Sequence, residues 1–174
     1  QHSLDFFQLF HQVELGLESS RRVDNYNVGL PGAGCLQSVE RHRADFLNLI
    51  EAEMDYVIGN EAEIRALWET DDLEDALTRT AAICDTVVCT RSGDGVTLIR
   101  KGERVDVPVT KVTPVDATGA GDQFAAGFLY GMATGRDLET CGKMGNICAA
   151  EVISHIGPRP QTSMMELFKE KGLV

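Results

Sequence analysis

The stretch Asp116-Ala117-Thr118-Gly119-Ala120-Gly121-Asp122 is the part of this sequence from which fold and chemistry can best be inferred. Gly119 and Gly121 allow backbone conformations that are closed to other residues, so consecutive N–H groups can converge on one point. The residues that follow have the pattern of a helix, and the partial positive charge at its N-terminus would face the same point. The sequence therefore predicts a backbone anion hole suited to a transferring phosphoryl group.

Asp122 ends this stretch and is the candidate catalytic base. Its carboxylate could accept a hydrogen bond from a substrate hydroxyl, although a carboxylate is a weak base beside an alcohol. Phosphoryl transfer through a loose transition state depends more on the orientation of the base than on its strength. The alternative interpretation is that Asp122 only caps a helix. The length of the string favours the catalytic interpretation over the capping one.

Short apolar runs alternate with segments of helical periodicity on both sides of this stretch. We expect strands at residues 56–58, 86–90, 96–100 and 105–109, and helices at residues 38–53, 62–68, 73–83, 122–132, 138–156 and 164–171. The alternation predicts an α/β layer fold with a mostly parallel sheet flanked by helices. Residues 21–34 lack periodicity and are expected to form a loop, and residues 1–38 are expected to pack less tightly than the rest.

Composition excludes several classes of partner. Of the 174 residues, 43% are hydrophobic and 25% are charged, which is typical of a soluble globular domain. The formal net charge of −11 argues against nucleic acid and anionic membranes as partners. No apolar run approaches the roughly 20 residues that span a bilayer. The five cysteines form no Cys-x-x-Cys pair, so we interpret them as buried thiols in a reducing cytoplasm.

Two other phosphate-binding patterns are absent from the sequence. A dinucleotide-binding fingerprint needs a third glycine in register after Gly119 and Gly121, and none is present. A P-loop needs glycine followed by lysine and then serine or threonine, which is also missing.

The stretch 116–122 resembles the signature of the ribokinase-like (PfkB) family of carbohydrate and nucleoside kinases, with Ala117 where that family usually has threonine. Asn60-Glu61-Ala62-Glu63 resembles the family's Asn-x-x-Glu motif. Residues 87–95 resemble its nucleotide-holding strand and turn, with Ser92 where glycine is common. Residues 146–159 are similar to its C-terminal nucleotide-side helix and following turn. The resemblance covers about residue 40 to the C-terminus.

The resemblance implies an ATP- and Mg²⁺-dependent kinase acting on a hydroxyl of a sugar or nucleoside, with an adenosine-like acceptor favoured. Asp122 would be the base, and the anion hole would come from the backbone amides of Gly119, Ala120 and Gly121. Mg²⁺ would be held through water by Asn60 and Glu63. The nucleotide pocket would be lined by Thr90, Gly95 and Asn146. The resemblance also allows a monovalent cation at the carbonyls of Asp116 and Thr118, and a homodimer.

Each of these assignments has a structural alternative. Asn60 and Glu63 also fit a capping box at a helix start, which is compatible with a magnesium site. Thr90 and Asn146 could equally be ordinary buried polar residues.

Members of the family are longer than this chain, which lacks a recognisable N-terminal half and lid. We therefore expect residues 1–38 to be a divergent or truncated segment and residues 39–174 to be the C-terminal part of a kinase domain. The chain could then be a catalytic half that needs its missing part. It could instead be a non-enzymatic nucleotide-binding or oligomerising module.

Overall fold

The computed structural model describes the backbone of residues 33–174 and the side chains of residues 43–174. The expectations for residues 1–38 therefore fall mostly outside the described residues. Where the two overlap, the prediction is wrong only for the last two residues of the loop expected at 21–34, because Ala33 and Gly34 belong to helix α2 (Ala33–Glu53). The helix begins five positions before the predicted Ser38, since alanine favours a helix and the proline and glycine lie just ahead of it.

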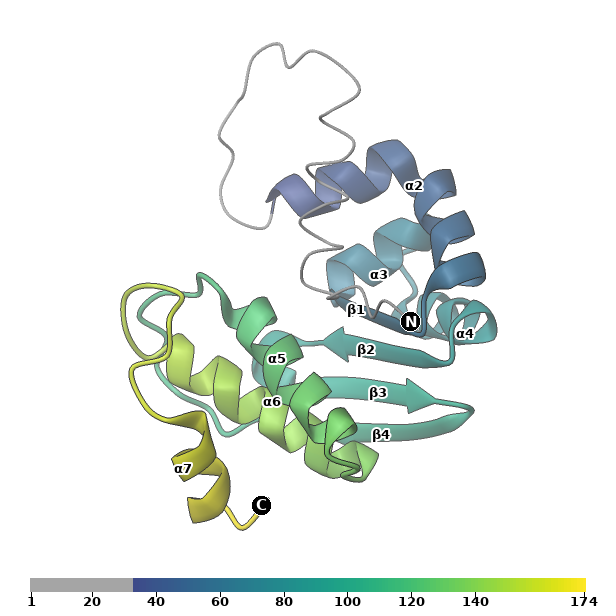
Figure 1. Cartoon of the computed structure of the whole chain (residues 1–174). Coiled ribbons are helices and arrows are strands. Elements are labelled where there is room, and N and C mark those ends of the chain that lie inside the picture. The colour runs from purple at the N-terminus through teal and green to yellow at the C-terminus, as the bar shows by residue number, and fades with distance from the viewer. Residues whose placement is uncertain (1–32) are drawn as a thin grey trace. The chain divides into compact units, whose positions relative to one another are not determined.

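A four-stranded mixed sheet organises the described residues (Figure 1). Its strands are neighbours in chain order: β1 (Tyr56–Asn60), β2 (Thr86–Thr90), β3 (Val96–Arg100) and β4 (Glu103–Val107). The β1–β2 pair is parallel, and the pairs β2–β3 and β3–β4 are antiparallel. The α/β layering is as predicted, but within the described residues only one strand pair is parallel. Strands joined by short turns, as β2, β3 and β4 are, must run antiparallel.

The β3–β4 hairpin turns through Lys101 and Gly102, whose φ angles are both positive, at 49° and 86°. Two residues of this kind make the tight turn that suits the twist of paired strands, and Arg100 accordingly pairs with Glu103. Strand β4 therefore begins and ends two residues earlier than predicted. Pro108 follows it and ends the strand, because proline has no N–H to donate to the ladder.

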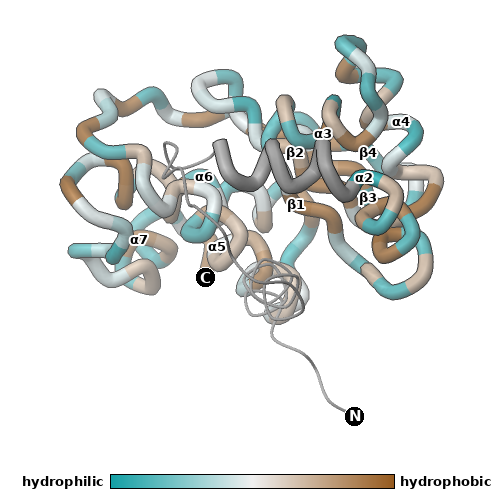
Figure 2. Tube along the Cα trace, turned by 90° about the horizontal axis from the view of Figure 1, so that it is seen from above, coloured by the Kyte–Doolittle hydropathy of each residue, from teal (hydrophilic) through white to brown (hydrophobic). Residues whose placement is uncertain are grey.

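Helices cover both faces of the sheet. Figure 1 shows α2, α3 and α4 on one side and α5 and α6 on the other. The remaining helices are α3 (Glu61–Trp68), α4 (Leu73–Ile83), α5 (Ala120–Ala133), α6 (Leu138–Val152) and α7 (Met164–Glu170), with a short 3₁₀ turn at Ser92–Asp94. The middle strands β2 and β3 carry mostly apolar or buried residues, and brown segments are visible among the strands in Figure 2, whereas β4 carries three charged residues. Val87 packs with the first set of helices and the adjacent Val88 with the second.

Helix α6 is four residues shorter than the prediction, which ended it at Ile156. The hydroxyl of Ser154 donates a 2.6 Å hydrogen bond to the carbonyl of Glu151, which competes with a further helical turn. Gly157 then takes a φ of 95°, so the chain turns away toward Pro158. The resulting loop is part of the candidate site.

The described cysteine side chains support the interpretation as buried thiols. Cys84, Cys89, Cys141 and Cys148 are free and buried. Burial raises the pKa of Cys89 to about 12 and the pKa values of Cys141 and Cys148 to about 11. These thiols therefore stay protonated and unreactive at neutral pH. Among the described helices, none combines the length and the apolar character needed to cross a membrane.

Candidate active site

The glycine-rich stretch forms the entry to helix α5. Gly119 is the N-cap, with a φ of 80°, and the helix begins at Ala120, two residues earlier than predicted. Asp122 is therefore the third residue of the first turn and is exposed. The capping interpretation of Asp122 is wrong, because the cap is Gly119 and no side chain makes a capping hydrogen bond there. Within the described part of the chain, no hydrogen-bond partner of the Asp122 carboxylate is found.

Three backbone amides of the same turn have no hydrogen-bond acceptor among the described residues. The amide of Ala120 donates to the carbonyl of Ala117 at 3.2 Å, and that of Gln123 donates to the carbonyl of Gly119 at 2.9 Å. The amides of Gly119, Gly121 and Asp122 find no acceptor among residues 33–174. Free N–H groups at a helix N-terminus favour an anion, so this turn can receive negative charge.

The Asp116 side chain holds this turn in place. Its Oδ1 accepts from the amide of Thr118 at 2.9 Å, and its Oδ2 accepts from the amide of Gly157 at 3.0 Å. The Gly157 amide, followed by Thr118, lowers the pKa of Asp116 to about 2, so the carboxylate is ionised throughout the neutral range. Sequence reasoning considered only the carbonyl of Asp116. The bond to Thr118 has the pattern of an Asx turn, which is visible in sequence, but the bond to Gly157 is not.

A second loop, residues 153–162, packs against the glycine-rich turn. The amide of Val115 donates to the carbonyl of Ile153 at 2.7 Å. The side chain of Gln123 donates from Nε2 to the carbonyl of Pro158 at 3.4 Å. A Cβ on Gly119 would lie only 2.6 Å from the Cβ of Pro158. The two segments therefore pack against each other, and Pro158 lies too close to Gly119 to leave room for a side chain there.

Gly119 and Gly121 are therefore expected to differ in how well they tolerate replacement by alanine. Gly119→Ala should destabilise the fold by about 2–4 kcal/mol, because alanine is strained at positive φ and would also collide with Pro158. Gly121→Ala is the matched control: its Cβ meets nothing within 4 Å, so the variant should melt like the wild type. Thermal melting of the two variants checks this. Equal melting temperatures would contradict the described contact.

The other predicted site residues lie at or near one end of the strands. In the strand register Asn60 pairs with Thr90, Thr90 with Val96, and Val96 with Val107, which forms a row across all four strands. This row lies at the carboxyl ends of the parallel strands, where open α/β sheets bind ligands. Figure 1 shows the arrowhead of β2 pointing toward the end of the molecule where α5 begins and α6 ends.

Asn60 and Glu63 make both bonds of a capping box at the start of α3. The amide of Asn60 donates to Glu63 Oε2 at 2.8 Å, and the amide of Glu63 donates to Asn60 Oδ1 at 3.0 Å. The structural alternative for these residues is therefore present. It leaves the second carboxylate oxygen of Glu63, Oε1, without a described partner, so a magnesium site remains compatible with the capping box.

The candidate nucleotide residues Gly95 and Asn146 both lie next to Val107 and Pro108 at the end of β4. Asn146 donates from Nδ2 to the carbonyls of Pro108 at 3.3 Å and Val107 at 3.5 Å. Gly95 lies against the same two residues. Thr90, the last residue of β2, donates from Oγ1 to the carbonyl of Gly59 at 3.5 Å. The structure thus places these residues at the same end of the sheet and gives each of them a structural contact there.

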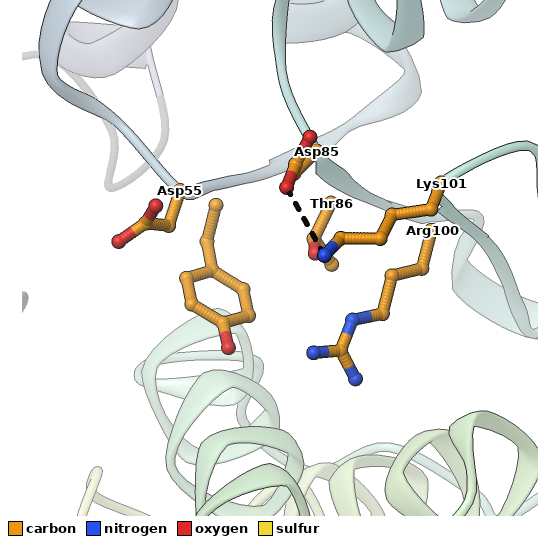
Figure 3. Close-up of a pocket in the computed structure, with 6 residues that line it drawn as sticks. Asp55, Asp85, Thr86, Arg100 and Lys101 are labelled. Atoms are coloured by element: carbon orange, nitrogen blue, oxygen red, sulfur yellow. Dashed lines mark ion pairs between the residues drawn. The ribbon is translucent and has the colours of Figure 1, made fainter.

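A separate pocket lies at the opposite edge of the sheet (Figure 3). It has a volume of about 190 Å³ and is lined by Asp55, Tyr56, Asp85, Thr86, Arg100 and Lys101. Lys101 Nζ and Asp85 Oδ2 form an ion pair across it at 3.6 Å. Four of these residues are at the amino ends of β1 and β2, and Arg100 and Lys101 are at the turn between β3 and β4. The glycine-rich turn contributes no residue to this pocket, so the pocket is not part of the candidate active site.

Comparisons with known proteins agree with this arrangement. Residues 35–164 match a protein family that is described as pfkB family carbohydrate kinase. An uncharacterized sugar kinase of Archaeoglobus fulgidus is 41% identical over 140 residues, which are 78% of this chain and 51% of that protein. The chain therefore spans about half the length of this curated relative.

Solved structures show the same likeness. A probable sugar kinase protein from Rhizobium etli matches with a TM-score of 0.78 and 45% identity, over 80% of this chain and 43% of that one. The adenosine kinase from Sinorhizobium meliloti matches with a TM-score of 0.76 and 41% identity, over 78% of this chain and 42% of that one. The fold is thus the ribokinase-like α/β fold predicted from the sequence, and the chain belongs to the pfkB family of carbohydrate kinases.

Proposed function

We propose that this chain carries the phosphoryl-transfer part of an ATP-dependent kinase whose acceptor is a hydroxyl of a sugar or nucleoside. The observation that carries the proposal is the first turn of α5, where the uncommitted carboxylate of Asp122 lies beside the unpaired amides of Gly119 and Gly121. A base and an anion hole on the same turn are what transfer of a phosphoryl group to an alcohol requires.

In the proposed step the acceptor oxygen forms a bond to the γ-phosphorus while the bond from that phosphorus to the bridging oxygen of ADP breaks. The hydroxyl proton passes to the carboxylate of Asp122. Charge on the outer oxygens of the phosphoryl group is stabilised by the free amides and by the partial positive charge at the start of α5. Asp116 and Pro158 keep the turn fixed, so little reorganisation accompanies the transfer.

The donor and its metal fit the carboxyl edge of the sheet. The free Oε1 of Glu63 is a hard oxygen donor near the exposed Asn60, and these two residues would hold a hydrated Mg²⁺ through water. When bound, the ion would neutralise phosphate charge. Thr90, Gly95 and Asn146 would line the nucleotide pocket from the same edge. The carbonyls of Asp116 and Thr118 are proposed for a monovalent cation.

An adenosine-like acceptor is favoured among the candidates, because a solved structure at 41% identity is an adenosine kinase. We further propose that residues 39–174 are the C-terminal part of the kinase domain and that residues 1–38 are a divergent or truncated segment. The net charge of −11 supports a small-molecule acceptor rather than a nucleic acid or a membrane, and the buried thiols support a cytoplasmic location. A homodimer is compatible with the proposal.

Melting and phosphorylation assays test the proposed function together. ATP with Mg²⁺ at about 100 times its dissociation constant should raise the melting temperature of the chain by about 5–10 °C. A panel that includes adenosine, other nucleosides, ribose and fructose should then show ATP-dependent phosphorylation by the complete protein. A melting shift without turnover on any acceptor would favour a non-enzymatic nucleotide-binding module. The absence of any shift would contradict both functions.

A further inference from the structure

Glu151, in the last turn of α6, is a buried carboxylate that none of the site assignments uses. Its side chain is only 8% exposed. Oε1 accepts hydrogen bonds from the amides of Gln161 at 2.8 Å and Thr162 at 2.9 Å. Oε2 lies 3.3 Å from Nε2 of His155, whose side chain is 14% exposed. One carboxylate therefore ties the end of the helix to residues ten and eleven positions further along the chain.

These bonds close the base of the loop of residues 153–162. The tip of the same loop carries the contacts to the glycine-rich turn: the amide of Gly157 donates to Asp116, and Pro158 lies against Gly119. Glu151 touches neither the turn nor Asp122 in any described contact. Its influence on the turn would pass through the loop alone.

We propose that Glu151 is a positioning residue for phosphoryl transfer, closing the 153–162 loop so that Gly157 and Pro158 hold the anion-hole turn in place. The expected effect on catalysis rests on the proposed function. The expected effect on the loop and the turn rests only on the described contacts. Without the carboxylate, the amides of Gln161 and Thr162 lose their acceptor, and the base of the loop is no longer closed by these two bonds. The turn then loses the segment against which Gly119 and Gln123 are packed.

The charge state of Glu151 is consistent with this role. Burial raises the pKa of Glu151, but the amides of Gln161 and Thr162 and the side chain of His155 outweigh it and hold the pKa below its ordinary value. The group is therefore ionised at neutral pH, and both of its oxygens act as acceptors.

Hydrogen exchange on the Glu151→Ala variant tests the structural part. We expect exchange to accelerate about tenfold at the hydrogen-bonded amides of Gly157, Gln161 and Thr162 in the loop, and also at those of Asp116 and Thr118, which are distant in sequence. Glu139→Ala is the matched control, because Glu139 is also on α6 and also forms an i,i+4 ion pair, with Lys143, but is exposed. It should leave exchange in both segments unchanged. Faster exchange at 154–162 with none at 116–119 would overturn the proposal.

Kinetics of the complete protein test the catalytic part. Glu151→Ala should lower kcat by about tenfold to a hundredfold with little change in the KM for the acceptor, because the loop positions the anion hole and not the acceptor. Glu151→Gln retains an oxygen for Gln161 and Thr162 and should recover most of kcat. Combining Glu151→Ala with Asp116→Ala should cost little more than Asp116→Ala alone, because both act through the same loop.

The two proposals can fail separately. If the wild-type protein phosphorylates no acceptor while Glu151→Ala still loosens residues 116–119, the proposed function fails and the positioning contact stands. If the wild type is active and Glu151→Ala keeps its full kcat, the positioning role is overturned and the proposed function is unaffected. Additive losses in the double variant would likewise overturn the shared route through the loop.

Discussion

Replacing Asp122 by asparagine is expected to lower kcat of the complete protein by about 10²–10⁴, the usual contribution of a general base. Asparagine keeps the size of the side chain but cannot take the hydroxyl proton. The carboxylate has no partner among the described residues and does not cap α5, so the substitution removes no structural contact. The melting temperature and its shift with ATP should therefore barely change. Steady-state kinetics, with folding checked by thermal melting, measures the effect.

The control for this variant is Glu139→Gln, which removes another exposed acid from the first turn of a helix, α6. It should keep the wild-type kcat, because Glu139 is paired with Lys143 and lies on none of the site segments. Any general electrostatic effect of losing a first-turn acid would appear in both variants. A well-folded Asp122→Asn protein that turns over at the wild-type rate would remove Asp122 from the mechanism.

The local sequence pattern was enough to predict the bounds of an element where turn or capping residues mark its ends. The bounds of β2 and α4 agree with the prediction, because an unbroken apolar run between turn residues and a helix started by Asp72 leave little ambiguity. The turn residues Lys101 and Gly102 between two strand patterns predict the hairpin of β3 and β4, and the structure confirms it. The antiparallel pairing of β2 with β3 was not predicted, and it is this pair that makes the sheet mixed. The end of α6 was missed because the Ser154 hydroxyl competes with the helix for the carbonyl of Glu151.

The packing around the anion hole could not be predicted, because its contacts join residues far apart in sequence. Asp116 and Gly157 are 41 positions apart, and nothing local marks the glycine as a donor to that carboxylate. For the same reason, the sequence does not show which glycine of the signature is constrained in its backbone conformation and packing. Sequence reasoning gave Gly119 and Gly121 similar importance, whereas only Gly119 has a positive φ and meets Pro158.

The magnesium and nucleotide residues show a different limit of sequence reasoning. Asn60 and Glu63 satisfy a capping box, and the same spacing would serve a hydrated ion, so one pattern supports two uses. Asn146 and Gly95 have structural contacts at the end of β4, which also suit a pocket wall. For these residues the assignment to Mg²⁺ or nucleotide stays a prediction until binding is measured.

Gly95→Ala is expected to be the most destabilising single-methyl change in the described chain, at about 3–5 kcal/mol. Gly95 is buried, with φ 96° and ψ −137°, a conformation that is nearly closed to alanine. Its Cβ would overlap the carbonyl oxygen of Val107 and would lie 2.9 Å from the Cα of Pro108. Because Val96 pairs with Val107, the backbone of β4 cannot move away without breaking the ladder.

Gly93→Ala in the same turn is the matched control, since its Cβ meets nothing within 4 Å and its φ is not positive. It should melt within about 1 °C of the wild type or slightly above it, because alanine reduces the freedom of the unfolded chain. Gly95→Ala should melt roughly 6–15 °C lower.

The melting curves also separate a packing role of Gly95 from a binding role. If Gly95 lines the nucleotide pocket, the ATP-induced shift in the melting temperature of the folded variant should shrink as well. A full shift on a lowered melting temperature would leave Gly95 with a packing role alone, and an unchanged melting temperature would contradict the contact with Val107 itself.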